Sequence, residues 1–186
     1  MGMGVSSEMV AICGMILGIL AGISFMATSE GIYSSLFWML GAVGCLLRAA
    51  CIQLDNILKH PGRHHDPDDI FFEELPERVS DAVTLVGFGF AIDSSPWLGL
   101  AAALGAIFSA YVRSFGISKG AGKIATSTGP MTRIHRLTLV MITATLMAIG
   151  VSLGDFRLTI PQAALWIIVT GCIATILMRW TRIRKF

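Results

Sequence analysis

Two acidic residues at helical spacing, Glu77 and Asp81, are the best candidates for chemistry in this sequence. Residues four apart lie on one face of a helix, so both carboxylates would face the same neighbour. Pro76 directly precedes them, and because proline suits the first position of a helix, we expect a helix to begin there. Stacked carboxylates resist leaving water unless a positive charge lies between them. A divalent cation would meet that need, and a solvated helix end at a membrane surface is the alternative.

Asp55 can add a carboxylate from a second helix. It lies near the end of an apolar segment, about two helical turns after Arg48. If it faces Glu77 and Asp81, acids from two helices form one cluster. The alternative is a plain charge at a helix end, although an acid there opposes the helix dipole. Arg48 lies well inside the apolar segment, where a charge is costly unless it reaches the surface or pairs with a carboxylate.

Three arginines are placed to bind an anion at the same edge. Arg133 and Arg136 are three apart and share a face at the start of a helix that Gly129-Pro130 opens. The free amides and the dipole of a helix N-terminus already favour an anion there. Arg113 lies near the end of the preceding apolar segment, at the same expected depth. Guanidinium groups suit phosphate, so the sequence predicts a phosphate site, with ordinary anchoring at the membrane edge as the alternative.

The elements that must position these residues are membrane helices. The chain is 54% hydrophobic and only 14% charged, with a mean hydropathy of +0.73, which argues against a soluble enzyme. We expect one all-α integral membrane domain, residues 1–186, with six transmembrane helices. The apolar segments lie near residues 9–27, 34–54, 76–92, 97–117, 131–153 and 160–180.

Lysine and arginine gather in the connections after the second, fourth and sixth segments, whereas the opposite connections are mainly acidic. The positive-inside rule then places both termini, and the acids and arginines above, on the cytoplasmic side. The net charge of +2 comes without a basic stripe, so we expect no nucleic-acid partner; the basic edge suits anionic lipid head groups.

Two further patterns concern packing. Gly14, Gly18 and Gly22 recur every four residues, which predicts close approach of another helix within the bundle, with a dimer face as the alternative. Asp66-Pro67 can cap a helix, and we expect a short one at the membrane surface that ends before Pro76.

These residues resemble the CDP-alcohol phosphatidyltransferase family, whose signature is Asp-x2-Asp-Gly-x2-Ala-Arg followed by Gly-x3-Asp-x3-Asp. The resemblance spans almost the whole chain and is strongest in residues 74–81, 111–113 and 129–131. Asp55 and Asp81 match the second and fourth acids, and Glu77 replaces the third. The remaining signature positions hold Ile52 (first Asp), Asn56 (first Gly), Lys59 and His60 (Ala-Arg), and Glu73 (second Gly).

The resemblance also implies roles. In the family the acids hold divalent ions and the last one acts as a base, while the glycine and Ala-Arg positions accommodate the cytidine nucleotide. Carried over, Asp55, Glu77 and Asp81 hold Mg²⁺ or Mn²⁺, and Asp81 is the catalytic base. By the same resemblance Asp55, Asn56 and Glu73 lie at the nucleotide. The predicted ligands of an acceptor phosphate are Arg113, Arg133 and Arg136.

The implied function is transfer of a phosphatidyl group from CDP-diacylglycerol to an alcohol, with release of CMP, in phospholipid synthesis. The arginines favour a phosphorylated acceptor, such as glycerol 3-phosphate or inositol phosphate. The resemblance implies a homodimer in a bacterial inner membrane. Two alternatives stay open: a catalytically inactive homologue that binds lipid or a partner, and a small transporter or structural membrane subunit.

Overall fold

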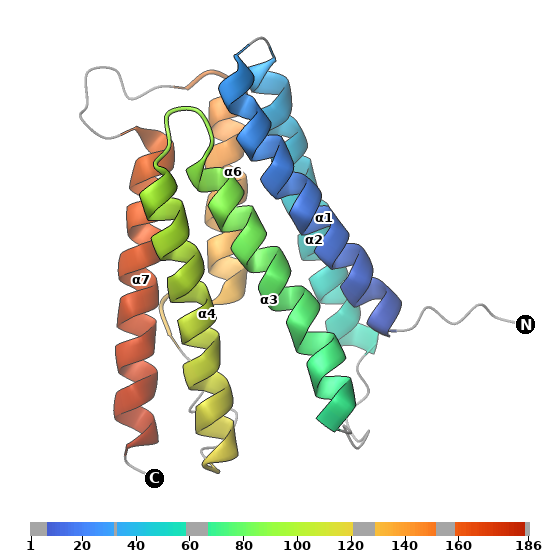
Figure 1. Ribbon diagram of the computed structural model, residues 1–186, viewed down its shortest axis with the longest axis vertical. Helices are drawn as coiled ribbons and strands as arrows, with labels where there is room; N and C mark the ends of the chain where they lie inside the picture. Colours follow the sequence, from blue (N-terminus) through green and yellow to red (C-terminus); the bar gives the residue numbers. More distant parts are fainter. Residues whose placement is uncertain (1–6, 32, 59–66, 121–128, 152–158, 185–186) are drawn as a thin grey trace, which may run out of the picture.

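The structure is a computed structural model, and it describes residues 7–31, 33–58, 67–120, 129–151 and 159–184. Within these residues the chain is entirely helical, with six α-helices and one short 3-10 helix (Figure 1). The elements in chain order are α1 (Ser7–Ala27), η1 (Thr28–Glu30), α2 (Ser34–Leu58), α3 (Pro67–Gly89), α4 (Pro96–Ser118), α6 (Arg133–Ala148) and α7 (Ile160–Ile183). The all-α, six-helix prediction is confirmed.

Four of the described helices are long and apolar enough to cross a membrane: α1, α2, α4 and α7. α6 has 16 residues, fewer than the roughly 20 that a spanning helix needs, and α3 begins with an acidic stretch. These two helices carry Glu77, Asp81, Arg133 and Arg136. α3 and α6, which are not long and apolar enough to cross a membrane by themselves, therefore carry most of the predicted site.

α3 differs from the prediction at its start. It runs without a break from Pro67 to Gly89, with Pro76 inside it, so the expected helix start at Pro76 and the separate surface helix before it are wrong. Pro67 occupies the first position, which proline favours. An interior proline removes one helical hydrogen bond, but neighbouring helices can compensate for such a loss in a bundle. Pro76 is buried and lines a cavity between α1, α2 and α6.

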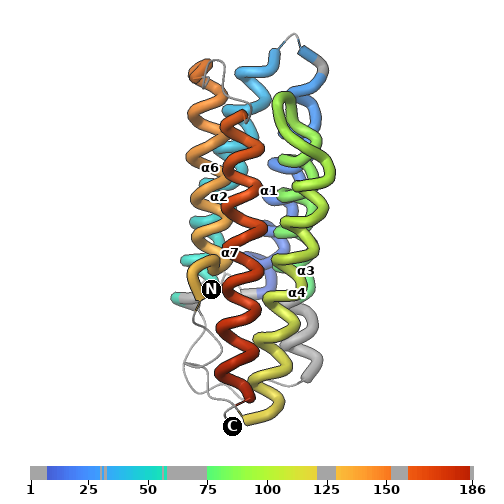
Figure 2. Tube along the Cα trace, turned by 90° about the vertical axis from the view of Figure 1, so that its left-hand side faces the viewer, coloured from blue at the N-terminus to red at the C-terminus, as the bar shows by residue number. Residues whose placement is uncertain are grey.

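The helices form a closed ring of neighbours. α1 packs on α2, which packs on α6; α6 packs on α7, α7 on α4, α4 on α3, and α3 returns to α1. Figure 2 shows α7 with α6 on one side and α4 on the other. Inside the ring, Phe25, Trp38 and Phe88 pack with ring centroids 5.3–5.6 Å apart and join the first three helices. The ring surrounds a polar cluster farther along the bundle.

The glycine stripe of α1 packs inside the bundle, as predicted. A Cβ at Gly22 would lie 2.6 Å from the carbonyl oxygen of Val83, and a Cβ at Gly18 would collide with Oγ of Ser80. Both partners belong to α3, so the stripe is what allows α1 and α3 to approach so closely.

The α1–α2 and α3–α4 turns lie at one end of the bundle, and the C-terminal end of α7 lies at the other (Figure 1). The start of α1 also points away from these turns. An even number of antiparallel passes explains why both described ends share one side. Which side of a membrane they face stays a prediction.

Candidate functional site

Asp81 lies at the centre of a buried cluster of ion pairs. Its Oδ1 accepts a hydrogen bond from Arg48 of α2, and its Oδ2 lies 2.8 Å from Nη2 of Arg136 in α6. Nε of Arg133 lies 3.5 Å from Oδ1. Arg48 is only 1% exposed, so the expectation that this arginine needs a carboxylate is met. Both oxygens of Asp81 are engaged by guanidinium groups.

Several polar groups hold Arg48 in place. Its Nη1 lies 3.4 Å from Oγ1 of Thr84 and its Nη2 lies 3.5 Å from the carbonyl oxygen of Glu77, both on α3. Oγ1 of Thr84 lies 3.0 Å from the carbonyl oxygen of Gly18 in α1 and 2.7 Å from that of Ser80, and its hydroxyl donates to one of the two. The glycine stripe thus brings the α1 backbone within hydrogen-bonding distance of the same polar group. A buried ion pair requires such additional hydrogen bonds to offset its desolvation.

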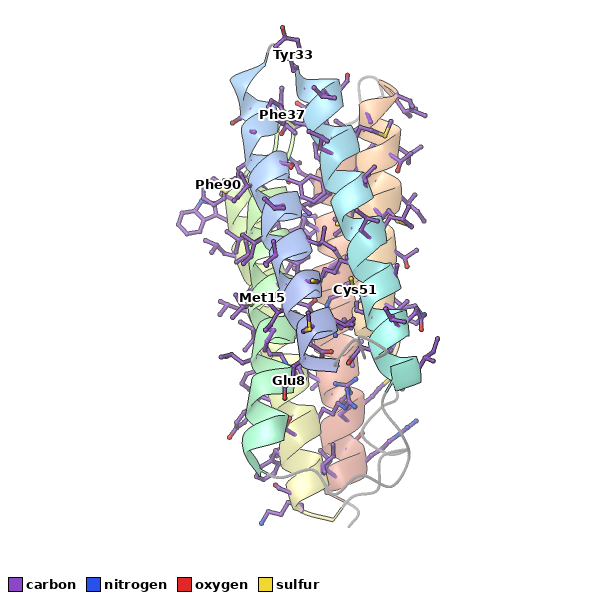
Figure 3. The ribbon with its side chains drawn as sticks, turned by 90° about the vertical axis from the view of Figure 1, so that its right-hand side faces the viewer. Glu8, Met15, Tyr33, Phe37, Cys51 and Phe90 are labelled. Carbon is purple, nitrogen blue, oxygen red and sulfur yellow. The ribbon has the colours of Figure 1, made fainter. Side chains whose placement is uncertain are left out.

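Glu77 and Asp55 meet at one cavity. Oε1 of Glu77 lies 2.6 Å from Nη1 of Arg133, and Asp55 is buried at 5% exposure. Both acids and Arg133 line a cavity of about 20 Å³, enough for roughly one water molecule. Met15 and Cys51, labelled in Figure 3, line it from α1 and α2. The structure therefore brings predicted acids of α2 and α3 to one cavity.

Ile52 lines the same cavity. It stands where the family signature has its first aspartate, and it presents hydrocarbon there instead of oxygen. Asn56 and Glu73 belong to α2 and α3, but their side chains lie outside the described residues, as do Lys59 and His60. The predicted nucleotide contacts of Asn56 and Glu73 stay predictions.

The segment before α6 positions its two arginines. The backbone N–H of Met131 donates to Oγ1 of Thr175 in α7 at 3.0 Å, and a Cβ at Gly129 would lie 2.9 Å from the same oxygen. Glycine is needed at 129 for this close approach. Thr132 then caps α6 through reciprocal side-chain bonds with His135. Docking on α7 and capping together aim the first turn of α6 at α3.

Arg113, the third predicted phosphate ligand, has no ion pair with Asp81 or Glu77 among the described residues. It is exposed on α4, and its charge interacts with Arg179 of α7. Arg179 is 6% exposed and donates from Nη1 to the carbonyl oxygen of Ser109 at 2.6 Å and to its Oγ at 3.0 Å. Arg179 also lies close enough to Arg136 for their like charges to repel. Sequence reasoning did not single out Arg179, although an arginine in an apolar segment is the signal that singled out Arg48.

A solved structure supplies the comparison for this fold. The phosphatidylinositol phosphate synthase of Mycobacterium tuberculosis, crystallised with manganese and citrate, superposes with a TM-score of 0.72. The match covers 97% of this chain and 83% of that chain, at 14% sequence identity. This chain has the CDP-alcohol phosphatidyltransferase fold. No protein-family model and no curated protein matches the chain.

The manganese in that phosphatidyltransferase raises the question of whether the residues here fit a divalent ion. Within the described ranges, no group of three His, Cys, Asp or Glu side chains is arranged to hold one. Both oxygens of Asp81 and one oxygen of Glu77 are bound to guanidinium groups instead. Mg²⁺ and Mn²⁺ need several oxygen ligands in near-octahedral geometry. The donor set, as the structure arranges it, does not fit such an ion.

Proposed function

We propose that this chain is a CDP-alcohol phosphatidyltransferase that moves a phosphatidyl group from CDP-diacylglycerol to a phosphorylated alcohol and releases CMP. The observation that carries the proposal is the direct pairing of the predicted phosphate ligands with the predicted acids. Arg133 contacts Glu77, and Arg136 contacts Asp81, within a fold shared with a phosphatidylinositol phosphate synthase. Each arginine can exchange its carboxylate for a substrate phosphate.

Substrate binding begins at Arg133. It is the most exposed of the three arginines around Asp81, at 18% for its side chain, and it borders the cavity shared with Asp55 and Glu77. Phosphate accepts paired, charge-assisted hydrogen bonds from a guanidinium group, so it competes well with a single carboxylate oxygen. A phosphate that engages Arg133 and Arg136 therefore releases Glu77 and Oδ2 of Asp81.

The released oxygen then serves as the base. Asp81 accepts the proton of the acceptor hydroxyl, whose oxygen forms a bond to the lipid-bearing phosphorus of CDP-diacylglycerol. The bond from that phosphorus to the bridging oxygen breaks, and CMP leaves with its electron pair. Arg48 keeps hold of Oδ1 and so fixes the orientation of the carboxylate. The arginines balance the charge of the departing nucleotide.

The remaining features complete the proposal. Asp55, Asn56 and Glu73 lie along the nucleotide, and Arg113 approaches the acceptor phosphate from α4. The protein acts as a homodimer in a bacterial inner membrane, with both termini in the cytoplasm. Mg²⁺ or Mn²⁺, the cofactor that the family resemblance implies, would stabilise the leaving group, but the donor set described above does not suit it.

Release of CMP tests the proposal. Purified protein in phospholipid nanodiscs is incubated with CDP-diacylglycerol and, separately, glycerol 3-phosphate or inositol phosphate. We expect CMP release that depends on an acceptor and is lost in Glu77→Gln and Asp81→Asn. Asp93→Asn, an acid in the turn at the opposite end of the bundle, is the matched control and should keep full activity. Helical content by circular dichroism verifies that each variant is folded, and acceptor-independent release, or none with any phosphorylated acceptor, refutes the proposal.

A catalytically inactive homologue is the second candidate function. Two observations favour it: Ile52 occupies the position of the first family acid, and both oxygens of Asp81 are engaged. Such a protein would bind CDP-diacylglycerol or another phosphate-bearing lipid through Arg133 and Arg136 without turnover. Saturable binding of CDP-diacylglycerol, without CMP release for any acceptor, distinguishes this function from the first.

A further inference from the structure

The charges around Asp81 balance without a metal. Three acids and three arginines lie around Asp81 or line the adjoining cavity, and the ion pairs at 2.6, 2.8 and 3.5 Å join those on α3 and α6 into one network. A carboxylate site for a divalent ion carries excess negative charge, which the ion neutralises. Adding an ion to this cluster would leave two positive charges uncompensated in a buried place. The six residues are Asp55, Glu77, Asp81, Arg48, Arg133 and Arg136.

Arg48 is fixed where it is. Its side chain is 1% exposed, and a Cβ at Gly18 of α1 would lie 3.1 Å from its Cδ, so α1 packs directly against its aliphatic part. Its guanidinium group reaches Thr84 and the carbonyl oxygen of Glu77 as well as Asp81. Arg133, near the cavity, can exchange partners with a ligand, whereas Arg48 borders a space of about 10 Å³, too small for its guanidinium group. An ion beside Asp81 would first have to displace this guanidinium group.

The cavity beside Asp55 has oxygen-bearing side chains on part of its wall, those of Asp55, Glu77 and Ser80, and largely hydrocarbon elsewhere. Its volume of about 20 Å³ matches roughly one water molecule, and its walls include Val10, Met15 and Ile52. Ile52 lies one turn after Arg48 on α2, so the helix face that would supply a further oxygen presents hydrocarbon. A hexacoordinate ion would find one side of this cavity without donors.

We infer that guanidinium groups replace the divalent cation in this protein: Arg48 permanently, and Arg133 and Arg136 until a phosphate binds them. The acid cluster takes up neither Mg²⁺ nor Mn²⁺. The catalytic role of this replacement rests on the proposed function. In that role the arginines provide the charge stabilisation that a metal supplies to a departing nucleotide. The test of the inference does not depend on that function.

Manganese binding tests the inference directly. Tag-free protein in phosphatidylcholine nanodiscs is titrated with Mn²⁺, and the signal of free Mn²⁺ is followed by electron paramagnetic resonance. We expect no saturable site with a Kd below about 1 mM in the wild type. The double variant Arg48→Met/Ile52→Asp, which removes the fixed cation and restores an acid, should gain a saturable site. Stoichiometric binding by the wild type that disappears in Asp81→Asn, but not in the control Asp93→Asn, overturns the inference whether or not the double variant folds.

CMP release in the presence of EDTA separates the two ideas. If CMP release in EDTA stays within about two-fold of the untreated rate and no Mn²⁺ site is found, the result supports both the transferase function and the replacement of the metal by arginine. Release that requires Mn²⁺, together with a saturable Mn²⁺ site, supports the transferase function and refutes the arginine replacement. No release and no Mn²⁺ site refutes the transferase function and leaves the replacement of the metal by arginine standing.

Discussion

Removing either partner of the Arg48–Asp81 pair should destabilise the fold, but to different degrees. Arg48→Met deletes one buried cation, and Asp81 then keeps Arg136 at 2.8 Å and Arg133 at 3.5 Å. Asp81→Asn leaves Arg48 and Arg136 facing each other without an anion between them. Breaking a buried ion pair by removing one partner costs about 3–5 kcal/mol. We therefore expect Arg48→Met to cost about 3 kcal/mol and Asp81→Asn about 5 kcal/mol.

The double variant Arg48→Met/Asp81→Asn provides the decisive comparison. With Arg48 gone, the uncharged amide at position 81 faces one buried guanidinium instead of two, so the second substitution should relieve part of the damage of the first. Residues in contact typically show coupling energies of about 0.5–3 kcal/mol, and we expect the upper part of that range here. The double variant should be more stable than Asp81→Asn alone.

The assay is unfolding by sodium dodecyl sulphate in mixed micelles, followed by the loss of helical circular dichroism. Asp93→Asn, in the turn at the far end of the bundle, serves as the control for removal of an acid. Additive effects in the double variant, or wild-type stability of Asp81→Asn, would contradict the ion-pair cluster as the structure shows it.

Three further variants test other parts of the site. Gly22→Ala should cost about 1–3 kcal/mol in the same unfolding assay, because its Cβ would lie 2.6 Å from a backbone oxygen; Gly14→Ala, with its nearest neighbour at 3.3 Å, should cost less. Thr175→Val removes the 3.0 Å bond to the segment before α6 and should cost about 1 kcal/mol while raising the KM for the phosphorylated acceptor. In isothermal titration with the phosphorylated acceptor, Arg133→Met should weaken binding about ten-fold or more, and the exposed Arg113→Met should weaken it less.

Hydropathy predicts the six-helix architecture well because helix burial in a bilayer depends mainly on composition over about 20 residues. The predicted start of α3 at Pro76 was wrong because local rules allow proline at the first position of a helix but not in its interior. In the structure Pro76 is buried inside α3 and lines a cavity, and packing of the surrounding helices can compensate for the missing hydrogen bond. Local propensity fails here because tertiary contacts decide the outcome.

The individual residues of the candidate site could be predicted from the sequence, but the ion pairs between them could not. Helical spacing placed Glu77 and Asp81 on one face, and the cost of a buried charge predicted that Arg48 needs an acid. Neither rule says which acid, because Arg48 and Asp81 are 33 residues apart and meet only through the packing of α2 on α3. The family resemblance, in turn, assigned a metal to a place where guanidinium groups lie.

The charges explain why α3 and α6 are the least membrane-like helices. Each would be costly in hydrocarbon alone, since a charged residue at mid-membrane costs about 3 kcal/mol or more. Together their charges neutralise one another inside the ring, with Asp81 of α3 bound to Arg136 of α6 and to Arg48 of α2. The stability of the bundle therefore depends in part on the same residues as the proposed chemistry. Under the proposed function, a substrate that takes Arg133 or Arg136 must supply a negative charge in exchange, as an anionic phosphate would.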